Sequence, residues 1–126
     1  MLLEEPEYFG PHSLCRAACK RFRALGEVLL DERDSVHGQI AVLAREVRAA
    51  IEAGILSRAI EPFSFLEEVL HEPRLHSEIE NAVAISFVVP VELRASTLGA
   101  QVLMEAEHAA SRVISILFSQ ERHEQA

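Results

Sequence analysis

The sequence has little of what most catalytic folds require. It contains 5 glycines among its 126 residues, and none of its serines lies in a G-x-S-x-G context. A Gly-rich loop that cradles phosphates or a dinucleotide is therefore missing, and so is the nucleophile elbow of a hydrolase. The adjacent acids Glu67 and Glu68 point about 100° apart on a helix, so they do not form a shared-proton dyad. We expect no enzymatic activity and no cofactor.

Cysteine is also scarce, which excludes a disulfide framework. Cys15 and Cys19 are the only 2 cysteines, and their i, i+4 spacing on a predicted helix is poor disulfide geometry. His12 shares their helical spacing, and His71 and His76 flank a predicted turn. No C-x-x-C or H-E-x-x-H motif accompanies these side chains. We interpret the cysteines as small core residues and predict no metal site.

A long apolar run and an excess of basic residues are absent too. The uncharged stretch 81–91 is far shorter than the roughly 20 residues of a membrane-spanning helix. The first residues lack the basic and apolar regions of a secretory signal, which favours a cytoplasmic protein. Asp and Glu number 20 against 12 Lys and Arg, giving a net charge of −8. Such a field repels nucleic acid and attracts a basic protein partner.

Helical periodicity is what the sequence does contain. The clearest amphipathic helix begins after Ser35 or Asp34, either of which can cap it, and ends before Gly54. Its apolar positions recur every three or four residues, at Val36, Ile40, Leu43, Val47 and Ile51. A similar stripe precedes it, at Leu14, Ala18, Phe22, Leu25 and Leu29. The short polar linker 31–35 predicts that these two helices form an antiparallel hairpin.

Three further helices are predicted in the second half. A short helix has Pro62 in its first turn and buries Phe63, Leu66 and Leu70. The next begins with a capping box of Ser77 and Glu80 and buries Ile79, Val83 and Phe87 until Pro90 ends it. The strand-like 86–91 has no partner strand, so we read it as this helix's end. The last helix starts near Ser96 or Thr97 and carries an apolar stripe, at Leu98, Val102, Ala106, Ala109, Val113 and Ile116 or Leu117.

The fold class expected from these helices is all-α, in a compact bundle of four to five helices. The length and the ordinary globular composition predict one domain over residues 1–126. Residues 1–10 and 120–126 are expected to be loosely ordered, because they carry no periodic apolar pattern.

Negative charge is concentrated in one part of the chain. Residues 59–80 contain 6 acids and 1 base, whereas residues 11–23 contain 4 bases and no acid. Carboxylates so arranged speed association with a cationic partner. The candidate partner-binding residues are Glu67, Glu68, Glu72, Glu78, Glu80 and Asn81. The alternative is that these acids only cap helices and face solvent.

Residues 65–87, "FLEEVLHEPRLHSEIENAVAISF", combine an F-L-E-E-type helix, a short polar turn and an acidic start that runs into N-A-x-x-x-S-F. This stretch resembles a family of small all-helical bacterial proteins of unknown function that are found beside polymorphic toxin genes. The resemblance implies an immunity-like protein that binds and neutralises a cognate toxin in the cytoplasm. Many such toxins are cationic nucleases, which would suit an acidic chain.

Two other functions remain open at this stage. The apolar residues Leu2, Leu3, Tyr8 and Phe9 either cover the core or pair with the last helix of a second copy. Pairing between copies would make the protein a homodimer or a larger homo-oligomeric adaptor. A third possibility is an enzyme or regulator built on an α-helical pocket that contains His71, His76 or His108.

Overall fold

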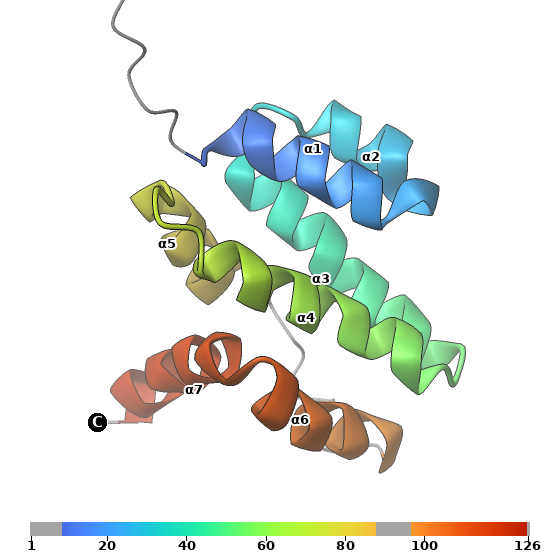
Figure 1. Ribbon diagram of the computed structural model, residues 1–126. Helices are drawn as coiled ribbons and strands as arrows, with labels where there is room; N and C mark the ends of the chain where they lie inside the picture. The colour runs from blue at the N-terminus through green and yellow to red at the C-terminus, as the bar shows by residue number, and fades with distance from the viewer. Residues whose placement is uncertain (1–8, 88–96, 126) are drawn as a thin grey trace, which may run out of the picture.

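The computed structural model describes residues 9–87 and 97–125, and these residues form seven α-helices and one short 3-10 helix (Figure 1). The helices are α1 (Pro11–Arg21), α2 (Gly26–Asp31), α3 (Val36–Glu52), α4 (Leu56–Leu70), α5 (Ser77–Ser86), α6 (Thr97–Ala109) and α7 (Ser111–Gln125), and the 3-10 helix η1 is Arg23–Leu25. The described residues contain no strand, only an isolated parallel bridge between Phe9 and Leu75. The all-α prediction is confirmed.

Helix α4 lies at the centre of the arrangement. Figure 1 shows α1, α2 and α3 on one side of α4 and α6 and α7 on the other, and α5 packs mainly against α3. The rings of Phe63 on α4 and Phe87 after α5 meet edge to face with centroids 5.2 Å apart, and both side chains are fully buried. No helix in the described part of the chain is both long enough and apolar enough to span a bilayer.

Helix α3 follows its prediction at both ends. The backbone N–H of Gly38 donates to Ser35 Oγ at 2.9 Å, so Ser35 is the N-cap. Gly54 adopts a φ of 77° just beyond the helix, the left-handed conformation that glycine reaches without steric cost. The inward face of α3 also carries Gln39, which is fully buried.

Gln39 joins the beginning of α1 to the turn before α3. Its Nε2 lies 3.1 Å from the carbonyl oxygen of Pro11 and 3.2 Å from those of Glu32 and Arg33. One buried amide group therefore links three backbone carbonyls from two segments of the chain.

The prediction of one continuous helix from residue 14 to Asp31 is wrong. The chain leaves helical geometry at Phe22, passes through η1 and reverses, so that α2 lies beside α1. Cys15 Sγ is 3.6 Å from the carbonyl oxygen of Leu29, whereas a straight helix would separate these residues by about 21 Å. The tight reversal thus lies within the first predicted helix, and α3 packs chiefly against α4 and α5.

The ring of Phe22 contacts the central helix at that break. It packs edge to face on Phe65 of α4, with centroids 5.4 Å apart. Such aromatic pairs add to the stability gained from burial alone.

Helix α4 begins earlier than its sequence predicts. It starts at Leu56, so that Pro62 lies in its interior and not in its first turn. The missing N–H of Pro62 removes one helical hydrogen bond, but the ring is buried against the core. Phe63, Leu66 and Leu70 are buried as predicted. The turns before Pro62 pack against the core, as fully buried Ala59 shows, so the helix begins N-terminal to the position that the proline predicts.

The last predicted helix is also divided. Ala110 separates α6 from α7, and it is buried while the predicted Ala109 is exposed. The break lets α6 pack on α4 while α7 packs on both α4 and α5. Helix α7 continues to Gln125. These divisions turn four or five expected helices into seven.

Candidate partner-binding surface

The acidic residues predicted to bind a partner surround the C-terminal half of α4 and the beginning of α5. The first of them, Glu67, points towards α7. Its Oε1 accepts hydrogen bonds from the backbone N–H groups of Arg112 and Val113 at 3.0 and 3.1 Å. Helix α7 follows Ala110, whose side chain has no oxygen, so the carboxylate of Glu67 replaces a local N-cap. Its side chain is only 15% exposed, and it serves the fold.

Glu68 points the other way, towards α1. Its Oε2 accepts from Arg21 Nη1 at 2.6 Å, and Glu61 accepts from Arg21 Nε at 2.9 Å. Hydrogen bonding to Glu68 first, and then to Glu61, raises the pKa of the Arg21 guanidinium above its ordinary value. Glu67 and Glu68 therefore lie on different sides of α4, as their adjacent positions on a helix require.

The beginning of α5 differs from the predicted capping box. The N-cap is His76, whose Nδ1 accepts from the backbone N–H of Glu78 at 3.1 Å, and Ser77 is already the first helical residue. The N–H of His76 donates to the carbonyl oxygen of Phe9 at 3.0 Å, beside the Phe9–Leu75 bridge. This contact with the segment before α1 places His76 at the helix entry.

The remaining predicted residues are exposed. Glu80 Oε2 lies 3.5 Å from Arg112 Nη2, and Glu78 Oε1 lies 3.6 Å from His37 Nε2. The side chains of Glu78 and Glu80 are 52% and 48% exposed, and Glu72 and Asn81 are exposed as well. The six acids from Glu61 to Glu80 and the three arginines Arg21, Arg74 and Arg112 leave a net charge of −3 on this part of the molecule.

Sequence reasoning missed a polar cluster between α3 and α5. His37 Nδ1 is 2.7 Å from Ser86 Oγ, and its Nε2 faces Glu78 as described above. His37 and Ser86 are 49 residues apart, so no local spacing could indicate their contact. A serine, a histidine and a carboxylate in line are the parts of an activated nucleophile.

The position of Ser86 argues against nucleophilic catalysis. It is the last residue of α5, where the negative end of the helix dipole opposes a developing oxyanion. We interpret the cluster as a set of polar contacts that joins the first turn of α3 to both ends of α5.

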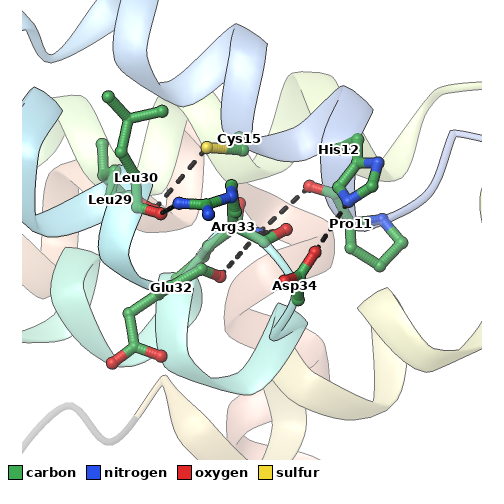
Figure 2. Close-up of polar contacts among 9 residues, drawn as sticks. Pro11, His12, Cys15, Leu29, Leu30, Glu32, Arg33 and Asp34 are labelled. Carbon is green, nitrogen blue, oxygen red and sulfur yellow. Dashed lines mark hydrogen bonds and ion pairs between the residues drawn. The ribbon is translucent and has the colours of Figure 1, made fainter.

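The other histidines do not meet in a pocket. His71 and His108 are exposed, and each Nδ1 lies within hydrogen-bonding distance of the backbone carbonyl four residues earlier in its own helix, at 2.7 and 3.1 Å. His12 Nε2 contacts Asp34 at 2.8 Å (Figure 2), and this contact lowers the pKa of the Asp34 carboxyl. Within residues 9–87 and 97–125, no three His, Cys, Asp or Glu side chains converge to hold a metal ion.

No known family model matches this chain, and no curated protein or solved structure is significantly similar to it.

Proposed function

We propose that this protein binds a cationic protein partner through the exposed acids around the α4–α5 connection, and that the partner is a bacterial toxin that it neutralises in the cytoplasm. The observation that carries the proposal is the net charge of −3 that remains when the six acids from Glu61 to Glu80 are counted together with Arg21, Arg74 and Arg112. The resemblance of residues 65–87 to immunity-like proteins supplies the class of partner. The protein itself then performs no chemistry and acts by covering the toxin.

The contacts that each acid makes within the protein show which of the predicted residues are available to a partner. Glu67 and Glu68 are engaged with α7 and α1, so their carboxylates hold the surface in place. Glu72, Glu78, Glu80 and Asn81 are exposed at a helix end or in the connection before it. The contacts of Glu78 and Glu80 are longer than 3.4 Å, so lysine or arginine of a partner can replace them at little cost. We assign docking to these four residues.

Such carboxylates act mainly on the rate of association. They bias the approach of a basic surface over about a Debye length, roughly 10 Å at 0.1 M salt. We expect a double reversal, Glu72→Lys with Glu78→Lys, to slow association with the partner about ten-fold at low salt. At high salt the difference should shrink because the field is screened.

The experiment uses tagged full-length protein as bait in the bacterium from which it comes. The captured partner is purified, its binding kinetics are measured at low and high salt, and its toxicity is tested with and without co-expression of the bait. A matched control is Glu105→Lys with Glu107→Lys, which changes net charge equally on the exposed side of α6. Circular dichroism checks that both variants keep their helix content.

The proposal is supported if one basic, growth-inhibiting protein binds wild type and control but binds the α4–α5 reversal slowly. It is overturned if both reversals behave alike, or if co-expression leaves toxicity unchanged. The alternative function is a homo-oligomeric helical adaptor without a toxin partner. It was predicted to pair through the last helix and the apolar N-terminus, of which Leu2, Leu3 and Tyr8 lie outside the described residues. Val28 and Leu30 on α2 are exposed apolar side chains that such pairing would also have available, at 46% and 50% exposure.

A further inference from the structure

Two thiols face one seam between α1 and α2. Cys15 and Cys19 are one helical turn apart on α1, and their sulfur atoms are 3.9 Å apart. Cys15 Sγ–H points to the carbonyl oxygen of Leu29 at 3.6 Å (Figure 2), and Cys19 Sγ–H points to that of Gly26 at 3.9 Å. Both acceptors belong to α2. The helical turn of α1 places the two sulfurs side by side, and the reversal of the chain at Phe22 brings the two α2 carbonyls against them.

Neither sulfur forms a disulfide bond. Both cysteines are free, with Cys15 buried at 4% exposure and Cys19 half-buried. His12, the third member of the spacing seen in the sequence, turns away to Asp34. Burial, and next the neighbouring Cys19, raise the pKa of the Cys15 thiol. Cys15 is therefore protonated at neutral pH, which disfavours ligands that require two thiolates.

The separation of the sulfurs excludes some products and suits another. A disulfide needs about 2.05 Å between sulfurs and a short Cβ separation, which an intact helical turn does not allow at i, i+4. A tetrahedral zinc ion would accept sulfurs about 3.8 Å apart, but it needs further protein ligands and thiolates. A trivalent arsenic atom needs only two neighbouring thiols, because its third substituent is its own.

We propose that Cys15 and Cys19 form a dithiol site for trivalent organoarsenicals. In the reaction with an arsine oxide, each S–H bond breaks and each sulfur forms an S–As bond, while the arsenic–oxygen bond is replaced and the oxygen leaves as water with both protons. Arsenic stays trivalent and no electron is transferred. Half-buried Cys19 reacts first, and Cys15 then closes the ring from a position already beside it.

The second step determines the affinity. Capture by Cys15 is intramolecular, and such linkage strengthens binding by about 100-fold or more over a single site. The closed ring also joins residues one turn apart on α1, in the register that the helix already holds. Binding should therefore preserve helix content and raise the melting temperature of the protein.

The test is intact-protein mass spectrometry of the folded full-length chain with phenylarsine oxide, in the presence of excess monothiol. The wild type should retain one phenylarsenic group, gained with loss of one water, and should release it to 2,3-dimercaptopropanol. Cys19→Ser, at the half-buried position, and Cys15→Ser should each bind at least about 100-fold more weakly. Circular dichroism before and after binding measures helix content and melting temperature.

Two results would overturn the site. One is an adduct that survives monothiol equally in wild type and Cys19→Ser, since a single thiol would then suffice. The other is an adduct whose rate of formation equals the rate at which the protein unfolds, as measured in urea, or an adduct that lowers helix content. In either case the unfolded chain, and not the seam between α1 and α2, would be what reacts. If Cys15→Ser fails to fold, the comparison with Cys19→Ser alone decides.

Discussion

Glu67 shows how a residue predicted for binding can be used by the fold. Its carboxylate caps α7 from another helix, with two backbone N–H donors on one oxygen. We expect Glu67→Ala to lower the free energy of unfolding by about 1 to 2 kcal/mol, because both donors lose their partner. Glu67→Gln keeps an acceptor oxygen and loses only the charge at the helix end, so it should cost about 0.5 kcal/mol.

Urea unfolding measures both changes, and the adjacent Glu68→Ala provides a matched control. The side chain of Glu68 is 65% exposed and pairs with Arg21, so its removal should cost at most about 1 kcal/mol. Equal losses for Glu67→Ala and Glu68→Ala would contradict the capping role.

Gly38 lies in the first turn of α3, against the side chain of Glu32. A Cβ at residue 38 would meet Glu32 Oε2, Cδ and Cγ at 2.0, 2.6 and 3.1 Å. These atoms belong to a flexible side chain, which can move aside. Gly38→Ala alone should therefore change stability little, as the gain in helix propensity offsets displacement of the carboxylate. In a Glu32→Ala background, the same change should stabilise by up to about 1 kcal/mol.

A double-mutant cycle in urea tests this coupling. If Gly38→Ala has the same effect with and without Glu32, the carboxylate does not explain why glycine occupies this position.

At the scale of elements, the contact between His37 and Ser86 joins α3 to α5. Its 2.7 Å separation is that of a good hydrogen bond in a half-buried setting. We expect Ser86→Ala to lower the free energy of unfolding by about 1 kcal/mol. Exposed Ser115→Ala on α7 should stay within about 0.5 kcal/mol of wild type. A fluorophosphonate probe should leave Ser86 unlabelled, and its labelling would revive a nucleophilic role.

The elements also show how far local signals reach. Ser35 and Gly54 mark the ends of α3 correctly because both act on backbone groups within a few residues. Beside the breaks at Phe22 and Ala110, the chain contacts residues that are far away in the sequence. The ring of Phe22 meets Phe65, and the backbone N–H of Arg112 meets the carboxylate of Glu67 on α4. Helix periodicity continues across both points, so sequence patterns alone join what the fold divides.

At the scale of the molecule, the two proposed functions require different exposed surfaces and predict different masses in solution. Among the described residues, the large apolar side chains that are exposed are spread over α2, the α3–α4 turn, α5 and α6, namely Val28, Leu30, Ile55, Ile85 and Met104. A stable interface needs about 800 Å² of continuous surface on each partner, and scattered single residues are ordinary. Size exclusion with light scattering should therefore give the monomer mass of 14.0 kDa. Twice that mass at micromolar concentration would favour the adaptor.

The sequence by itself determined the helical class, the inward stripe of each helix and the concentration of acids between residues 59 and 80. These properties depend on periodicity and composition, which can be read from the order of the residues along the chain. Only the tertiary structure decided where helices break and which acids remain available. Glu67, Glu68 and Glu80 meet partners 32 to 47 residues away. Which side chains meet across such a distance in the sequence depends on how the helices pack. No short sequence pattern specifies that packing.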